Sequence, residues 1–334
     1  MISVFIGIDL GGTNLKSVLL DSNGCLLAEK ECLTPKKSSE LIPAIIKLSS
    51  ELCAGLEAVA YQKVALGIGI PGIFDVSQGV VSQMVNLPGW EGVPLAQNLA
   101  RELGLPVFID NDVNVMAIGE QKFGSAQNVQ DVLCITLGTG VGGAWILNGT
   151  IYRGVSYAAG EIGHMNLIQN GLQCGCGNFG CLEAYTGNKG FMTWLEADLS
   201  QSPMNSILSQ WVQQGKNLSP KLITEAAKMN DSFALQTWKK YATYLGTILA
   251  GVVNLMNPEL IVVGGGIAEA GKFLFDPLNQ VIKARAMKNH GEHIQIVKAG
   301  LGNKAGKIGA AALAMEEIRK GTHYLKNSEL LKTH

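Results

Sequence analysis

Short apolar runs alternate with amphipathic stretches along most of the chain. Residues 2–8 (ISVFIGI) are apolar and rich in β-branched side chains, the turn DLGGTN follows at 9–14, and residues 15–24 are again apolar. This order predicts a β-hairpin with glycines at its tip. Because the same strand, glycine turn and strand recur at 131–149, we expect a weak internal duplication with one copy in each half.

The remaining segments predict helices that alternate with further strands. Residues 185–256 should be mostly helical, and residues 259–271 read as a buried strand followed by a glycine-rich turn into a helix. Other helices are expected at 38–56, 93–104, 114–124 and 305–320, and other strands at 63–72, 105–112 and 293–302. This alternation indicates an α/β architecture, and the polar tail after residue 320 should fray.

Composition narrows the class of protein. A chain of 334 residues with 47% hydrophobic and 16% charged side chains should form two globular domains. Lys and Arg total 26 against 27 for Asp and Glu, and there is no dense basic stretch, so nucleic acid is not an expected partner.

No segment of the sequence indicates export or membrane insertion. The N-terminal apolar run has no basic region before it and ends at Asp9, so it reads as a strand. Residues 242–256 are too few to span a bilayer and should form the buried end of a helix. Seven cysteines, an odd number, fit a reducing compartment, so we expect a cytoplasmic protein.

Three cysteines and one histidine have the spacing of a metal site, H-x9-C-x-C-x4-C. Thiolates and an imidazole at this spacing are typical of a closed tetrahedral zinc site of structural type. The alternatives are free cysteines beside a core histidine, or a disulfide, and a C-x-C pair is poorly placed for a disulfide. We therefore predict zinc bound by His164, Cys174, Cys176 and Cys181.

Two glycine turns are candidates for phosphate binding, because backbone N–H groups can point at phosphate oxygens where side chains are missing. One contains Asp9, Gly11, Gly12 and Thr13, and the other Gly138, Thr139 and Gly140. The second also fits G-x-G-x-x-G, but a strand follows it where a dinucleotide fold needs a helix, and the chain has no Walker A motif. A tight hairpin without a ligand is the alternative for each turn alone. Together with the glycines at 264–266, they favour nucleotide binding.

Asp110, Asn111 and Asp112 end a predicted strand, where α/β folds place active sites. A carboxylate there could accept the proton of an attacking hydroxyl group. The same run is also typical of a helix N-cap, so Asp112 could cap a helix starting near Val113 or serve both purposes.

From residue 4 to residue 320 the chain resembles the ROK sugar kinases (repressor, open reading frame, kinase) of the actin/hexokinase/Hsp70 superfamily. DLGGTNLKSVLL resembles the first phosphate motif, LGTGVGGAW the second and IVVGGGIAEAG the adenosine motif. The cysteine–histidine pattern and the motifs GIGIPGIFD, NLPGW, DNDVNVMAIGE and AAGEIGHM also match.

The resemblance implies a two-domain actin-like ATPase fold of ribonuclease H type with an active-site cleft between the domains. The small domain would comprise 1–120 and 304–325, and the large domain 121–303 with the zinc loop and nucleotide site. It also implies ATP-dependent phosphorylation of a hexose, usually at the 6-hydroxyl, with Mg²⁺ near Asp9 and a structural Zn²⁺. In similar proteins the large-domain helices, including 234–256, often form a dimer interface, so a homodimer is expected.

The resemblance assigns roles to individual residues. Asp112 would be the general base. The sugar would contact Gly72, Asn86, Asn111, Asp112, Glu161, His164 and Glu183. The nucleotide would contact Asp9, Gly11, Gly12, Thr13, Asn14, Lys16, Gly138, Thr139, Gly140, Gly265 and Gly266.

Glucose is the favoured substrate, and N-acetylglucosamine and N-acetylmannosamine are the alternatives. The fit of an acetamido group depends on loop positions near Gly72 and Tyr157. A sugar-responsive repressor is disfavoured, because the first hairpin begins at residue 4 and leaves no room for a helix-turn-helix. A non-catalytic sugar-binding module is disfavoured because Asp112 and the glycine turns are present.

Overall fold

The computed structural model describes residues 2–54, 61–84, 90, 92–201 and 206–321, and these residues fall into two compact units. The first unit contains the described residues up to 128, together with 151–159 and 300–321. The second contains 129–150 and 160–299. The resemblance implied that segments 121–128, 151–159 and 300–303 belong to the large domain. In the structure they pack with the first unit.

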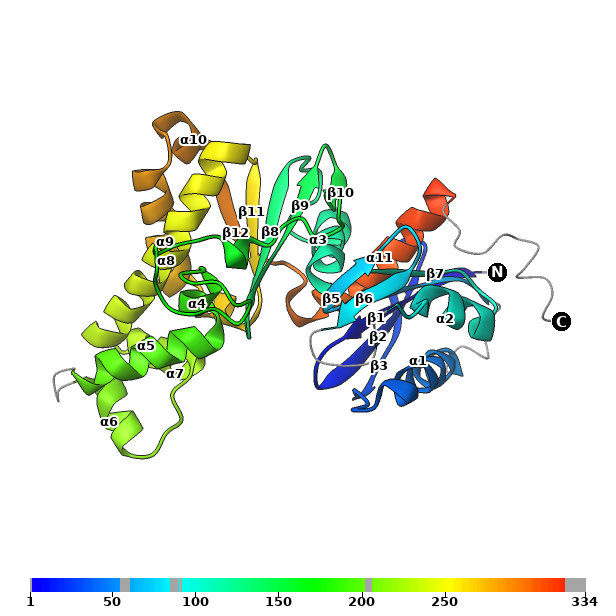
Figure 1. The fold of residues 1–334 in the computed structure, drawn as a ribbon, viewed down its shortest axis with the longest axis horizontal. Coiled ribbons are helices and arrows are strands. Elements are labelled where there is room, and N and C mark those ends of the chain that lie inside the picture. The colour runs from blue at the N-terminus through cyan, green and yellow to red at the C-terminus, as the bar shows by residue number, and fades with distance from the viewer. Residues whose placement is uncertain (1, 55–60, 85–89, 91, 202–205, 322–334) are drawn as a thin grey trace. The chain divides into compact units, whose positions relative to one another are not determined.

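The first unit is a five-stranded sheet with helices on both faces (Figure 1). Its strand order is β3-β2-β1-β4-β7, in which β1 pairs antiparallel with β2 and parallel with β4. The elements are β1 (Ile2–Leu10), β2 (Asn14–Asp21), β3 (Leu26–Leu33), α1 (Ser38–Cys53), β4 (Tyr61–Ile70), β5 (Gly72–Asp75), β6 (Val80–Met84), α2 (Leu95–Leu103), β7 (Val107–Asn111), α3 (Asp112–Phe123), η4 (Gly302–Lys304) and α11 (Ala305–Lys320).

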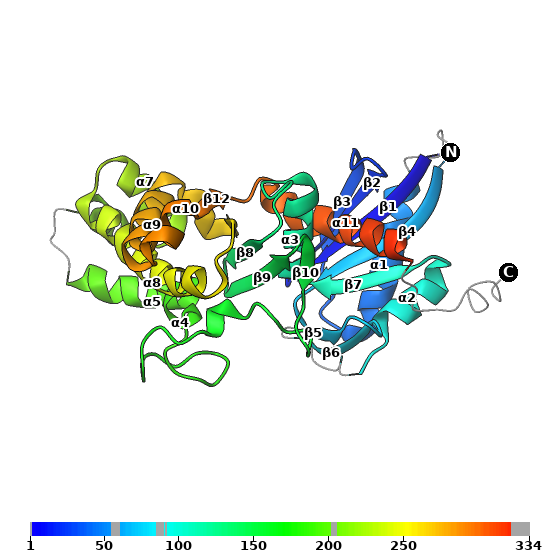
Figure 2. The same ribbon diagram turned by 90° about the horizontal axis from the view of Figure 1, so that it is seen from above.

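The second unit repeats this topology in a sheet of order β10-β9-β8-β11-β12 (Figure 2). Here β8 pairs antiparallel with β9 and parallel with β11. The elements are β8 (Val132–Leu137), β9 (Val141–Leu147), β10 (Thr150–Tyr152), η2 (Ile162–His164), α4 (Glu183–Thr186), α5 (Asn188–Ser200), α6 (Ile207–Gln213), α7 (Pro220–Lys228), α8 (Ser232–Met256), β11 (Leu260–Gly264), η3 (Gly266–Ala270), α9 (Lys272–Arg285), α10 (Lys288–His293) and β12 (Gln295–Lys298). The internal duplication is therefore confirmed.

Alternating side chains on β1 explain how helices cover both faces of the first sheet. Val4, Ile6 and Ile8 are buried in a core with Leu41 and Ile45 of α1. Gly7 points to the opposite face, where a Cβ atom would collide with the backbone of α11. Gly67, its neighbour on β4, faces α11 in the same way. The paired glycines thus let an alanine-rich helix pack directly on the strands.

Most predicted elements are confirmed, and α11 has the bounds that the sequence predicted. The last strand is shorter than predicted, because β12 covers only Gln295–Lys298 and the chain then turns towards η4. The segment after β11 forms the short 3-10 helix η3 before α9 begins at Lys272. Strands β3, β5, β6 and β10 were not predicted. The fraying expected of the tail falls on residues 322–334, outside the described part.

Candidate functional site

The first glycine turn joins β1 to β2 and is held by the segment that follows β3. Within the turn, the Gly11 N–H donates to the Asn14 carbonyl oxygen at 3.0 Å. Thr34 binds the turn twice: its hydroxyl donates to the Gly11 carbonyl oxygen at 2.6 Å, and its N–H donates to the Thr13 carbonyl oxygen at 2.8 Å. These bonds fix the carbonyl groups of Gly11 and Thr13, so the segment after β3 holds the conformation of the turn.

A cavity of about 470 Å³ adjoins this turn within the first unit. It is lined by residues of the turn, of the segment after β3 and of the position just before β5. The lining residues are Leu10, Gly11, Gly12, Thr13, Leu33, Thr34, Pro35, Lys36, Pro71 and Met84. The cavity therefore brings the first phosphate motif next to Pro71, the neighbour of the predicted sugar contact Gly72.

The parallel strands β1 and β7, with β4 between them, each place an acidic residue along one edge of the first sheet. Asp9 on β1 is in register with Gly69 on β4, and Gly69 is in register with Asp110 on β7. Lys16 lies opposite Asp9 on the hairpin partner β2. Burial raises the pKa of Asp9 above its ordinary value, while the charges of Lys16 and Lys307 oppose that shift. Asp9 is thus a carboxylate that a bound cation would stabilise in its charged form.

Asn111, rather than Asp112, is the N-cap of α3. The Asn111 side-chain oxygen accepts from the Val113 N–H at 2.8 Å and from the Asn114 N–H at 3.4 Å. Asp112 is the first residue of the helix, and its carboxylate also accepts from the Val113 N–H at 3.1 Å. The alternative in which Asp112 caps this helix therefore does not hold, because Asn111 already occupies the cap position and its side chain accepts from the first N–H groups of the helix.

Three of the sugar contacts predicted for the first unit, Gly72, Asn111 and Asp112, lie close together at this turn. The Asn111 side-chain nitrogen lies 3.5 Å from the Gly72 carbonyl oxygen, so the start of β5 and the end of β7 are neighbours. Asp112 follows directly in the chain. Asn86, the other predicted contact, lies outside the described residues.

The second glycine turn joins β8 to β9 and adjoins the glycines after β11. The Gly138 N–H donates to the Gly140 carbonyl oxygen at 3.0 Å within the turn. Gly265 has a positive φ of 85° and packs so closely that a Cβ atom would collide with the Leu137 carbonyl oxygen. Because β8 and β11 are parallel neighbours, the predicted second phosphate motif and adenosine motif meet at one sheet edge.

Glu183, a predicted sugar contact, links this turn to the cysteine loop. One carboxylate oxygen accepts from the Val141 N–H at 2.9 Å, directly after Gly140. The other lies 3.9 Å from the sulfur of Cys174. Glu161, a further predicted contact, has its carboxylate 3.8 Å from Nε2 of His164. Glu161 and Glu183 thus flank the cysteine–histidine cluster, and the third predicted contact, His164, is part of it.

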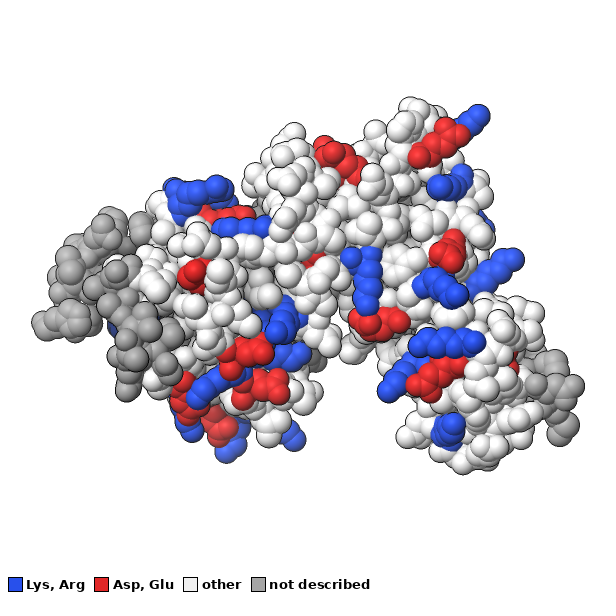
Figure 3. Space-filling view, turned by 180° about the vertical axis from the view of Figure 1, so that it is seen from behind, with Lys and Arg blue, Asp and Glu red and all other residues white. Residues whose placement is uncertain are grey.

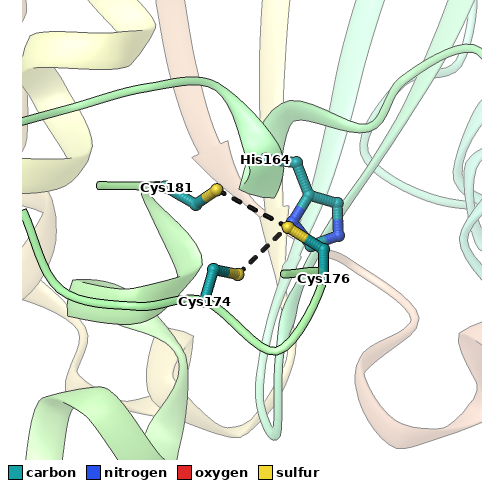
Figure 4. A group of neighbouring side chains, drawn as sticks. All are labelled: His164, Cys174, Cys176 and Cys181. Carbon is teal, nitrogen blue, oxygen red and sulfur yellow. Dashed lines mark hydrogen bonds between the residues drawn. The ribbon is translucent and has the colours of Figure 1, made fainter. Parts of the chain in front are cut away.

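The predicted metal ligands gather into one cluster (Figure 4). The ligand atoms of His164, Cys174, Cys176 and Cys181 all lie within 4.8 Å of one another. Nδ1 of His164 is 3.7 Å from the Cys174 sulfur, and the Cys176 and Cys181 sulfurs are 3.8 Å apart. Cys174, Cys176 and Cys181 form no disulfide, so the alternative of a disulfide among these ligands does not hold.

This geometry fits zinc. A tetrahedral ion with bonds of about 2.3 Å to sulfur would place two thiolates about 3.8 Å apart, close to the separation found between Cys176 and Cys181. Burial raises the pKa of Cys174, and it raises that of Cys181 to about 12, whereas a backbone hydrogen bond at Asn178 lowers the pKa of Cys176. A divalent cation would supply the positive charge that buried thiolates need.

Residues 5–317 match the ROK family over most of the chain. The chain belongs to the ROK family. Its duplicated sheets are the actin-like ATPase fold that the resemblance implied.

Relatives within the ROK family include both kinases and repressors. The chain is 34% identical to a glucokinase of Halalkalibacterium halodurans over 94% of this chain and 95% of that protein. A ROK family glucokinase from Streptomyces griseus, solved in complex with glucose and AMPPNP, has a TM-score of 0.80, 32% identity, and coverage of 94% of this chain and 99% of that one. A xylose repressor of Bacillus spizizenii is 28% identical over 94% of this chain and 77% of its own length.

The surface of this ROK protein carries charges of both signs. Lys and Arg side chains lie next to Asp and Glu in small groups on the face shown in Figure 3. Several of these pairs are local, such as Lys47 with Glu51 at 3.8 Å on α1. In the described part of the chain, no helix is long and apolar enough to cross a membrane.

Sequence reasoning did not identify Thr34 or Arg153. Thr34 contacts the first glycine turn, and Arg153 forms an ion pair with Asp110 at 2.6 Å. A threonine followed by proline at the end of an exposed strand gave no signal of its own. Arg153 is one of 26 basic residues, and only the fold brings it to Asp110.

Proposed function

We propose that this ROK protein transfers a phosphoryl group from ATP to the 6-hydroxyl of a hexose, and that the hexose is glucose. The observation that carries the proposal is the pair of glycine turns at equivalent positions of two duplicated sheets, with Asp112 at the edge of the first sheet. The similarity to glucokinases at 32–34% identity supports glucose as the acceptor, and the bound AMPPNP of the Streptomyces griseus enzyme supports ATP as the donor.

Asp112 is the proposed general base. At the first turn of α3, directly after the carboxyl end of β7, its carboxylate would accept the proton of the sugar 6-hydroxyl as that oxygen attacks phosphorus. Asn111 and Gly72 would hold the middle of the sugar ring, together with Asn86. Glu161, His164 and Glu183 would bind its anomeric end.

The two glycine turns are the proposed phosphate sites. Gly12 and Thr13 on the first turn and Thr139 and Gly140 on the second would bind phosphate oxygens, supported by Asn14 and Lys16, while Gly265 and Gly266 would border the adenosine. The Mg²⁺ that accompanies ATP would offset phosphate charge, with Asp9 as the nearby carboxylate. Since such transfer depends mainly on positioning and charge stabilisation, the rigid turns are the catalytic contribution of the backbone.

We also propose that His164, Cys174, Cys176 and Cys181 bind a structural Zn²⁺. Four protein ligands leave no open position for water, so the ion would hold the loop that carries Glu161 and Glu183 rather than take part in chemistry. His164 would bind zinc through Nδ1, which faces Cys174, and leave Nε2 for the sugar beside Glu161.

Replacing one ligand tests this metal site. We expect Cys176→Ser to lose zinc and glucose affinity together, because the loop that presents Glu161 and Glu183 loses its anchor. Metal analysis and glucose calorimetry measure the two effects. Cys25→Ser is the matched control, since Cys25 is also an exposed free cysteine. A zinc-free Cys176→Ser protein with full glucose affinity would contradict the structural role.

A panel of sugars tests the proposed substrate. ADP release would be measured with Mg²⁺ and ATP on glucose, N-acetylglucosamine, N-acetylmannosamine, mannose and fructose. Glucose should lead by about tenfold or more in kcat/KM, which is about 1.4 kcal/mol of transition-state discrimination. A lead by an N-acetylhexosamine would keep the kinase and change its substrate.

A sugar-responsive regulator is the second candidate, because xylose repressors match 94% of this chain. The panel separates the two functions. A protein that contains zinc and binds a sugar but turns over none of the panel with ATP would favour the regulator.

A further inference from the structure

Asp110 is a fully buried carboxylate at the end of β7, two residues before Asp112. One of its oxygens, Oδ2, accepts from Nε of Arg153 at 2.8 Å and lies 2.6 Å from Nη2 of the same side chain. The other oxygen, Oδ1, accepts from the Asn111 N–H at 2.7 Å and from Nδ2 of Asn114 at 2.8 Å. Each oxygen of this carboxylate therefore has two partners.

The two asparagines that donate to Oδ1 lie on either side of Asp112 in the chain. Asn111 precedes it and Asn114 follows it by two residues, so Asp110 holds the backbone before Asp112 and a side chain after it. Asn114 is itself buried, at 4% exposure, so its amide has no alternative contact with bulk water. The carboxylate of Asp110 thus fixes the turn from which Asp112 projects.

Arg153 belongs to the first unit, although the chain before residue 151 and after residue 159 belongs to the second. It follows β10 and lies in the segment 151–159, which packs with Asp110 in that unit. Its carbonyl oxygen accepts from the Ala159 N–H at 3.0 Å, so the segment closes on itself directly before Gly160 and Glu161. Only 17% of the Arg153 side chain is exposed. The guanidinium group is therefore placed to balance one specific buried carboxylate.

We propose that Arg153 and Asp110 form a positioning pair for Asp112, a role that rests on the proposed kinase function. Neither side chain would touch the sugar. Arg153 holds the Asp110 carboxylate in one orientation, and that carboxylate holds Asn111 and Asn114, which set the position of Asp112. The planar guanidinium group offers Nε and Nη2 to one oxygen at once, which the point charge of a lysine cannot do.

The pair should affect the chemical step more than substrate binding. A general base must lie within hydrogen-bond reach of the hydroxyl that it deprotonates, and a displacement of about 1 Å can cost about 100-fold in rate. Asn111, one of the proposed sugar contacts, keeps its own side-chain bonds to the Val113 and Asn114 N–H groups when the pair is broken, so substrate binding should depend less on this pair than the chemical step does.

The experiment measures kcat and the KM values for glucose and ATP in Arg153→Gln, Arg153→Lys, Asp110→Asn and the double variant Arg153→Gln/Asp110→Asn. Each variant is assayed at a temperature well below its melting temperature. We expect Arg153→Gln to lose about 100-fold in kcat while KM for glucose and ATP changes by less than about threefold. Arg153→Lys should fall between Arg153→Gln and wild type. The double variant should be no slower than Asp110→Asn alone, because the two side chains act as a unit.

Glu120→Gln is the control for a merely structural role. Glu120 is also a fully buried carboxylate, at the other end of α3, and accepts from the N–H groups of Ser125, Gly300 and Leu301. Where both variants lower the melting temperature by the same amount relative to wild type, Glu120→Gln should keep a higher kcat than Arg153→Gln. Equal kcat losses, or a wild-type kcat in Arg153→Gln, would overturn the positioning role alone. An inactive wild-type protein would overturn the kinase function and this inference with it.

Discussion

At the residue scale, the turn 110–114 separates two roles that the sequence left together on Asp112. Asn111 caps α3, so Asp112 is not required for starting the helix. The prediction of a carboxylate at this edge came from the strand pattern alone, because a strand followed by a helix leaves few places for an active site. The assignment of the cap could not be predicted, since either Asn or Asp can serve as an N-cap.

Replacing Asp112 tests its role as the base. Asp112→Asn should lower kcat by about two to four decades, because an amide cannot accept the hydroxyl proton. Glucose affinity, measured by calorimetry, should largely survive, and the melting temperature should change little because Asn111 still caps the helix. Near wild-type turnover in this variant would remove Asp112 from the mechanism.

Thr34 is the second residue whose role became visible only in the fold. Thr34→Val keeps the shape of the side chain but removes the hydroxyl that binds Gly11. The loss of one such hydrogen bond, about 1 kcal/mol, should raise KM for ATP roughly fivefold and leave KM for glucose unchanged. Thr34→Ser, which keeps a hydroxyl, is the control. If both variants had the same KM for ATP, the hydroxyl would not hold the phosphate turn.

At the element scale, the sequence predicted buried strands well and exposed strands poorly. Strands β1, β4 and β8 follow apolar runs that one or two buried faces require. Strand β3 carries alternating charges and exposed leucines, with Leu33 76% exposed, and it exists because its backbone pairs with β2. Such pairing leaves no periodic apolar signal. The strands β5 and β6 were missed because they have only 4 and 5 residues, too few to show a periodic apolar pattern.

An ion pair joins β3 to α11 and gives a testable dependence on pH. Lys307 donates to Glu29 at 2.8 Å, and this hydrogen bond, with the charges of Lys307 and Lys304, lowers the pKa of Glu29. A lowered pKa in the folded state adds stability above the ordinary value of 4.5, and this stability is lost as the pH falls through the folded-state pKa.

We therefore expect Glu29→Gln to melt at a lower temperature than wild type at neutral pH. The difference should shrink and disappear in acid, once Glu29 of the wild type is protonated as well. Melting temperatures over this range measure the effect, and Glu31→Gln, further along the same strand, is the control. A difference independent of pH would show that the charge of Glu29 is not the cause.

At the scale of the whole molecule, the duplication divides the work between two similar sheets. One glycine turn and the proposed base belong to the first unit, and the other glycine turn and the cysteine–histidine cluster belong to the second. Sequence motifs predicted this division because each copy keeps its own glycine turn. They could not predict that segment 151–159 packs with the first unit, where Arg153 forms its ion pair with the buried Asp110.

The expected homodimer also belongs to this scale and stays a prediction. Leu255 near the end of α8 is 77% exposed. Met287, whose N–H donates to the side chain of the adjacent Asn254, is 63% exposed. Apolar side chains of this size suit an interface between subunits. Light scattering should give twice the chain mass of 35.5 kDa, and a monomer at all concentrations would contradict the prediction.

The most direct test of the account is the identity of the product. The purified protein would be incubated with glucose, ATP and Mg²⁺, and the phosphorylated sugar would be identified by phosphorus and proton NMR alongside the ADP formed. The account predicts glucose 6-phosphate in equal amount to ADP, and almost none from Asp112→Asn. ADP without a sugar phosphate, or a phosphate on another carbon, would contradict it.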